Sequence, residues 1–267
     1  MNARTLPPVQ VAGISFWATR FPGWEIARAV IRGEAAAPEG NSPRPAPTML
    51  APTERRRAPD SVALALEVAA KACEGSEIAT DTLPSVFAST HGDLAISDYM
   101  CSTLATTPTM VSPIKFHNSV HNAAAGYWTI GTHCLAPYTA ISAHHYTFGM
   151  GLLETLVQVV DTQAPVLYVA FDVEGKGPLR AISQSEGLVG VGLVVEPARE
   201  NARGMRLTAH VGAESAVTLA TSQAAELVAK NSMAPCFPLL EALAREQSAK
   251  VTVATSPNSR LMLELSR

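Results

Sequence analysis

The fold is decided by residues 119–153, which read SVHNAAAGYWTIGTHCLAPYTAISAHHYTFGMGLL. The small residues of the segment 123–130 (AAAGYWTI) predict a closely packed helix, and a CLAP turn follows it. Residues 138–143 (YTAISA) are rich in β-forming residues and predict a strand. A pair of histidines at 144–145 comes next, and an apolar helix is expected from residue 149 to residue 160.

Strand and helix patterns alternate on both sides of this stretch. The expected elements before it are a strand at 9–17, a helix at 24–32 stopped by Gly33, a helix at 61–72 capped by Asp60, and a strand at 85–90. Those after it are strands at 165–172 and 187–197, a strand beyond Arg206, a helix at 238–245 and a hairpin at 250–265. Residues 34–59 are rich in proline and alanine, so we expect an extended surface crossing with Arg55–Arg57 in a solvated loop. The alternation predicts an α/β fold of layered mixed sheets and helices.

Composition narrows the class of protein. Of the 267 residues, 47% are hydrophobic and only 16% are charged, and the formal net charge is −3. The basic surplus of a nucleic-acid-binding protein is missing, and the low charge density suggests that a partner subunit covers part of the surface. Neither a signal peptide nor a membrane span of about 18 apolar residues is indicated, which predicts a cytoplasmic protein. The four cysteines form no CxxC pair, which argues against a zinc ribbon.

The junction between the strand at 138–143 and the helix at 149–160 is the most informative point for chemistry. A sharp turn there places a side chain at the end of a strand and at the beginning of a helix, as in a nucleophile elbow. Backbone N–H groups and the helix dipole at such a place favour developing negative charge.

The stretch SVHNAAAGYWTIG and the strand after it resemble the β-ketoacyl synthases of the thiolase fold. The resemblance is best over residues 85–195, and Asn122, Gly126, Ile130 and Pro137 fall into register with the family. It implies a thiolase-like (ketosynthase) fold with a reduced C-terminal half. The chain would be a single domain of residues 1–267, in which 1–200 form the N-terminal half and 201–267 an abbreviated C-terminal part.

The departures from the family decide the expected function. The resemblance places His145 at the position of the nucleophilic cysteine and His144 at the preceding alanine. A condensing enzyme needs a thiolate there to hold the acyl chain. The family's C-terminal histidine pair is also missing, since His210 is the sole histidine after residue 197, and no Gly-rich oxyanion loop is present. We therefore expect no condensing activity from the chain by itself.

Within the family, this combination resembles the chain length factors, which pair with an active ketosynthase and shape its acyl tunnel. The stretches RRRAPDSVALAL, VFASTHGDL and PIKFHNSVHNAAAGYWTIG resemble the short chain length factors of aryl polyene pathways. The resemblance implies a heterodimer with a full-length β-ketoacyl synthase, with acyl carrier protein as a further candidate partner and no cofactor. The residues expected at the tunnel or interface are Met110, Phe116, His117, His121, Asn122, Tyr138 and Ile141.

Two alternatives stay open. Six of the seven histidines (His91, His117, His121, His133, His144 and His145) lie between residues 91 and 145. Their spacings do not form HxxxH or HExxH on one helix face, because His117 and His121 lie in a stretch that begins as a loop, so no metal site is expected. We expect His117 and His121 to be hydrogen-bonded structural histidines. The second alternative is an enzyme, a malonyl-carrier-protein decarboxylase or thioesterase that uses His145 as its base. Cys134 lies in the turn before the strand and is a poor candidate nucleophile.

Overall fold

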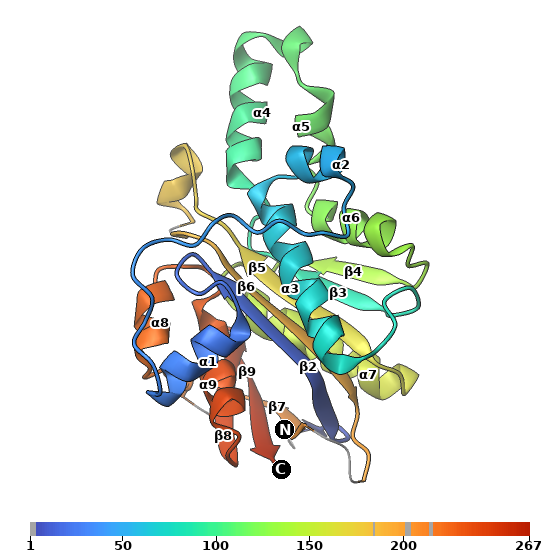
Figure 1. Cartoon of the computed structure of the whole chain (residues 1–267), viewed down its shortest axis with the longest axis vertical. Helices are drawn as coiled ribbons and strands as arrows, with labels where there is room; N and C mark the ends of the chain where they lie inside the picture. Colours follow the sequence, from blue (N-terminus) through green and yellow to red (C-terminus); the bar gives the residue numbers. More distant parts are fainter. Residues whose placement is uncertain (1–3, 184, 201–203, 214–215) are drawn as a thin grey trace.

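The computed structural model describes residues 4–183, 185–200, 204–213 and 216–267. Within these residues the strands form one mixed sheet in the order β4-β3-β5-β6-β2-β7-β9-β8, with β1 paired to β7 (Figure 1). The strands are β1 Arg4–Thr5, β2 Val9–Ala18, β3 Ser85–Ala88, β4 Tyr138–Ile141, β5 Val166–Asp172, β6 Val189–Pro197, β7 Met205–Gly212, β8 Ala249–Ser256 and β9 Ser259–Ser266. The predicted α/β fold class is confirmed.

Helices cover both faces of the sheet. They are α1 Trp24–Arg32, α2 Pro52–Arg57, α3 Asp60–Ser76, α4 Leu94–Thr106, α5 Pro113–His117, α6 Ala123–Thr132, α7 Thr147–Thr162, α8 Gln223–Val228 and α9 Phe237–Arg245. Short 3₁₀ turns occur at η1 Pro108–Met110, η2 His144–Tyr146, η3 Pro178–Ala181 and η4 Ala234–Cys236. None of the described helices is both long and apolar enough to cross a bilayer.

The core is divided between the two faces of the sheet by the alternation of side chains along each strand. On β5, Val166, Tyr168 and Ala170 belong to the cluster that includes α7 and α9. Leu167, Val169 and Phe171 belong to the cluster that includes α3 and α6. All seven residues of β5 are buried, which explains its uninterrupted apolar sequence.

Helix α3 lies unusually close to the sheet. A Cβ atom at Gly192 of β6 would overlap the backbone carbonyl of Val68, and one at Gly13 of β2 would overlap that of Ala72. Glycine is therefore needed at both positions for α3 to pack where it does.

Three parallel strands position the candidate site. Strand β3 pairs in parallel with β4 on one side and with β5 on the other. The carboxyl ends of these strands consequently meet at one edge of the sheet, which is the usual place for ligands in α/β folds. Among the described strands, β4 is the last in the sheet order and pairs with β3 alone.

An arm made of α4, η1 and α5 projects from the body at the top of Figure 1. Only Leu94 and Ile96 of α4 are buried. Leu104, Met110, Ile114 and Phe116 expose between 43% and 71% of their surface on this arm.

Most of the predicted elements are confirmed, and three predictions were wrong. Asp60 does not cap α3: Pro59 is the N-cap, and Asp60 lies in the first turn with an ion pair of 2.6 Å to Arg44. The Arg55–Arg57 run lies in α2 rather than in a loop, where cations in the last turn of a helix are favourable. His117, expected near a loop, ends the short helix α5.

Candidate functional site

A cavity of about 900 Å³ opens at the carboxyl ends of the parallel strands. Thr90 and His91, which follow β3, line it together with His144 and His145, which follow β4. Segments far away in the sequence complete the lining, chiefly Val217–Ala220 and Ala229–Ser232. The cavity therefore brings the predicted nucleophile position next to the C-terminal part of the chain.

The two histidines of the junction lie in η2, between β4 and α7. The turn is fixed by Thr147, whose hydroxyl donates to the carbonyl oxygen of His144 at 2.7 Å and accepts the Ala143 N–H at 3.0 Å. His144 has a positive φ of 52°, which is uncommon for a residue with a Cβ. The structure thus places His144 and His145, both exposed, at the N-terminal end of a 16-residue helix, as expected.

Four imidazoles gather around this turn. The rings of His144 and His145 have centroids 3.8 Å apart, and that of His91 lies 6.1 Å from His144. Burial lowers the pKa of His91, and the positive charges that His144, His121 and His145 can carry lower it further. Both effects favour the neutral form of His91.

His121 contacts the same region from the turn before α6. Its Nε2 lies 2.8 Å from the carbonyl oxygen of Ser89. Because a carbonyl oxygen only accepts, the proton must be on Nε2. This bond agrees with the expected structural, hydrogen-bonded histidine.

A buried carboxyl group binds the two residues that precede His91. Asp172, the last residue of β5, is 3% exposed and accepts hydrogen bonds from the Ser89 hydroxyl at 2.8 Å and from the Thr90 N–H at 3.0 Å. Burial raises its pKa to about 7, although these hydrogen bonds act in the opposite direction.

None of the cysteines lines the cavity in the part of the chain that the structure describes. Cys134 precedes β4, at the opposite end of the strand from His144, and is 4% exposed with its thiol directed to the Leu83 carbonyl. Cys236 is fully buried, which raises its pKa, and burial raises the pKa of Cys73 to about 12. Cys101 is exposed on the arm. The chain offers no activated thiol at this site.

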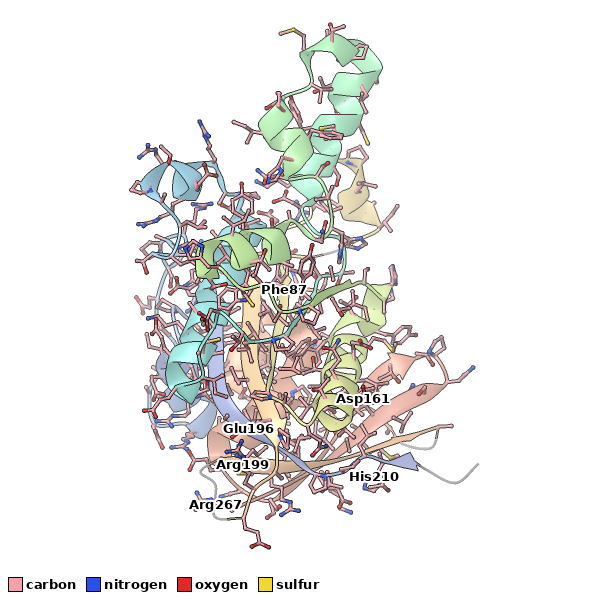
Figure 2. All side chains as sticks on the ribbon, turned by 90° about the vertical axis from the view of Figure 1, so that its right-hand side faces the viewer. Phe87, Asp161, Glu196, Arg199, His210 and Arg267 are labelled. Carbon is pink, nitrogen blue, oxygen red and sulfur yellow. The ribbon has the colours of Figure 1, made fainter. Side chains whose placement is uncertain are left out.

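His210, the histidine of the C-terminal part, lies elsewhere. It is on β7, where its Nδ1 is 2.9 Å from the Thr5 hydroxyl. Figure 2 shows it near the lower end of the view, well below Phe87 on β3. It does not line the cavity.

The predicted tunnel and interface residues fall into two groups. Met110, Phe116 and His117 lie on the arm, and the His117 ring packs against Tyr127 with centroids 5.8 Å apart. Asn122 donates to the Tyr138 hydroxyl at 2.9 Å, which joins α6 to the start of β4, while Ile141 lies at the other end of that strand.

Sequence reasoning did not identify Thr90, Asp172, Lys230 or Asn231. The one available signal was Asp172, a charged residue that ends an otherwise apolar run. Among the described residues, no three histidine, cysteine or carboxylate side chains are arranged to hold a metal ion.

Comparison with known proteins places this geometry in a family. Residues 31–258 match the family described as β-ketoacyl synthase, N-terminal domain. The chain belongs to the β-ketoacyl synthase family. A search of curated protein sequences found no match.

Solved structures of ketosynthases share the fold. The complex of the ketosynthase ApeO with its chain length factor ApeC from Xenorhabdus doucetiae matches with a TM-score of 0.72 and 19% identity, covering 96% of this chain and 98% of the matched one. The ishigamide ketosynthase/chain length factor matches with a TM-score of 0.67 and 16% identity over 97% and 99% of the two chains. AntDE:AntF, a type II ketosynthase complex with its acyl carrier protein, matches with a TM-score of 0.77 and 10% identity over 98% and 99%. At these identities the likeness establishes the fold.

Proposed function

We propose that the chain is a chain length factor, a non-catalytic ketosynthase-like subunit that pairs with an active β-ketoacyl synthase and shapes its acyl tunnel. The pathway would be of the fatty acid or polyketide type, with aryl polyene biosynthesis as the specific candidate. In this proposal residues 1–267 act as a single ketosynthase-like domain, and the carrier protein reaches the complex through the partner or through both subunits.

The observation that carries the proposal is the pair of imidazoles at the end of β4 where a condensing enzyme needs a thiol. The thiols of Cys73, Cys134 and Cys236 are buried, and that of Cys101 lies on the arm. Acyl-imidazoles hydrolyse readily, so histidine cannot store the chain as a cysteine thioester does. Two of the matched structures are complexes of a ketosynthase with a chain length factor, and the matched chains are nearly equal in length to this one. These matches support the same role.

Two features of the surface also support the proposal that a partner subunit binds here. Among the described residues, β4 ends the sheet and pairs with β3 alone, so no described strand pairs with the backbone groups on its outer side, an edge that proteins normally cover. The arm that projects from the body exposes Leu104, Met110 and Phe116 by 55% to 71%. Exposed apolar side chains gathered in this way are typical of interaction sites.

The second candidate is a decarboxylase or thioesterase that uses His145. Its support is the position of His145 on a cavity large enough for an acyl group. The two candidates differ in whether the chain acts alone.

Co-expression tests the proposal. The chain is produced with and without a full-length ketosynthase from the same organism, and the products are compared by size-exclusion chromatography and assayed with acyl and malonyl carrier proteins. We expect a stable heterodimer whose condensing activity needs both chains. A stable monomer with no affinity for that ketosynthase would contradict the proposal, and hydrolysis of acyl or malonyl carrier protein by the chain alone would favour the second candidate.

A further inference from the structure

A second cavity lies away from the histidines, between β2 and the helices α1 and α3. It has a volume of about 560 Å³, and none of its lining residues lines the 900 Å³ cavity. Its walls come from Ile14–Trp17 of β2, from Pro22–Ile26 around the start of α1, and from α3 between Glu67 and Gly75. The function proposed above makes no use of this cavity, which we call the β2 groove.

A tight turn after β2 builds one wall of the groove. Ala18 and Phe21 exchange backbone hydrogen bonds, each of 2.8 Å, so the chain reverses and α1 begins beside the strand that it has just left. Strand β7 pairs with β2 only over Val9–Val11, so no described strand pairs with β2 on that side beyond Val11. Helices rather than a further strand therefore bound the groove.

The groove has an aromatic and apolar lining. Trp17 and Trp24, two of the three tryptophans of the chain, line it together with Pro22 and Ile26. Ile26 is 40% exposed, and Trp24 is half-buried with part of its surface packed against the core. These surfaces suit the apolar body of a small molecule, and the volume lies in the range that is usual for ligand pockets.

The charged side chains of the groove are mostly carboxylates. Glu25, Glu67 and Glu74 line it together with Lys71. Lys71 pairs with Glu74 at 2.7 Å, and Glu25 pairs with Arg28 at 2.7 Å. Glu67 forms no ion pair with any described residue, although it is half-buried. Burial raises the pKa of Glu67, and the positive charge of Lys71 offsets this only in part. A cation bound beside Glu67 would compensate this carboxylate.

We propose that the β2 groove binds a small organic cation, a protonated amine or amidine carried on an apolar body. The cationic group pairs with the Glu67 carboxylate and lies over the Trp24 ring, because a tryptophan face attracts cations. The apolar body packs against Ile26 and Pro22. This inference is independent of the chain length factor proposal, since the groove shares no residue with β4 or with the arm.

Two probes of equal shape test the proposal: benzamidine, a planar aromatic cation, and benzamide, its neutral counterpart. Each is titrated into the full-length chain labelled with ¹⁵N-tryptophan, and the indole N–H signals are followed by NMR. Only this chain is labelled, so the spectrum can also be recorded on its complex with a ketosynthase. Trp24→Phe identifies the Trp24 signal, and Trp128, fully buried on α6, is the internal reference.

We expect benzamidine to shift the Trp24 signal saturably, to leave the Trp128 signal unchanged, and to bind about tenfold more tightly than benzamide. Glu67→Gln should reduce this preference to about twofold, because it removes the charge and keeps the side-chain volume. A purely structural role of Glu67 would weaken both probes equally and leave their ratio unchanged. Glu154→Gln is the matched control and should keep the preference, since Glu154 is another half-buried glutamate in a helix, on α7 and outside the groove.

Three results would overturn the proposal: equal binding of the two probes, an unchanged ratio in Glu67→Gln, or no saturable shift of the Trp24 signal with benzamidine. A Trp24 signal that moves when the chain is concentrated without any probe would show that a second copy covers the groove, and would overturn it as well. None of these results bears on the pairing with a ketosynthase, which is measured separately by co-expression.

Discussion

The rings of His91 and His144 meet edge to face, with centroids 6.1 Å apart and planes at 89°. His91 follows β3 and His144 follows β4, so the contact spans the ends of two paired strands. A condensing enzyme would need its acyl-accepting group at this place. This region is occupied by imidazoles, and no described thiol reaches it.

The chain alone should not accept an acyl group. Radiolabelled acyl carrier protein should leave no stable label on it, because an acyl-imidazole at His145 would hydrolyse and Cys134 is buried. The co-expressed ketosynthase, labelled under the same conditions, is the positive control. A stable adduct mapped to Cys134 or His145 would show that the chain keeps acyl-transfer chemistry.

The variant His145→Cys should gain a reactive thiol without becoming a condensing enzyme. The N-terminal end of α7 should lower the pKa of the new thiol, so iodoacetamide should modify it faster at pH 7 than it modifies the exposed Cys101 of the same molecule. Peptide mass spectrometry resolves the two sites. Chain extension by this variant alone would mean that the C-terminal part supplies the histidine and oxyanion groups that we find missing.

The elements that the sequence predicted well are those with a strong local pattern. The strand β5 needed only an uninterrupted apolar run, and the helix at 24–32 needed only a glycine to stop it. Gly33 has a positive φ of 73°, which is typical of a C-terminal cap. Helix α4 was not predicted, because only Leu94 and Ile96 at its beginning are buried and the rest of the arm has no apolar face directed to the core.

The candidate site was predictable only in part. The histidines at 144 and 145 adjoin a recognisable strand, so their place was correctly anticipated. The contact between Ser89 and Asp172 joins residues 83 positions apart, and no local pattern reports such a pairing. The part of the cavity wall formed by Ala229–Ser232 could not be predicted either, because its position depends on how the C-terminal part of the chain packs against the sheet.

Replacement of His144 by alanine should raise the pKa of His91. Burial is the main reason that this pKa is low, and the charge of His144 is the next, so a shorter side chain at 144 both admits water and removes a like charge. An NMR titration of histidine-labelled protein measures the shift. His210→Ala is the control and should leave His91 unchanged, because His210 contacts Thr5 instead. A His91 pKa that does not move would show that the two rings are not electrostatically coupled.

Proline at residue 140 should weaken pairing with the ketosynthase and leave the chain folded. Ser85 N–H donates to the Pro137 carbonyl and Ser89 N–H donates to that of Ile141, so the odd-numbered residues of β4 turn their backbone groups toward β3. Ala140 therefore turns its N–H toward the free edge, and proline removes that donor.

We expect Ala140→Pro to weaken the complex at least about tenfold, the equivalent of roughly 1.4 kcal/mol, in a pull-down or size-exclusion titration. Leu227→Asp is the control: Leu227 is another partly exposed apolar residue (37%), on α8 and outside the expected interface. Equal binding by Ala140→Pro and the unsubstituted chain would remove β4 from the interface.

Substitutions on the arm should change product length without abolishing turnover by the partner. Met110 and Phe116 are 71% and 61% exposed in the chain alone, so changing them should not disturb the fold. The backbone around Met110 is held independently by the Tyr99 hydroxyl, which contacts the Met110 carbonyl and the Ser112 N–H. His121→Trp is a poorer choice, because His121 binds Ser89 and lies close to Gly92.

If the arm lines the partner's tunnel, Phe116→Ala should lengthen the product and Met110→Trp should shorten it. One methylene changes discrimination by only about 1 kcal/mol, so these large changes in volume are needed for a visible shift. Leu135→Ala is the control, an almost fully exposed residue (97%) at the far end of β4. Product length is measured by mass spectrometry at equal total flux. Opposite shifts support a ruler on the arm, loss of all product in both variants points to a purely structural interface, and unchanged lengths in well-folded complexes place the tunnel in another segment.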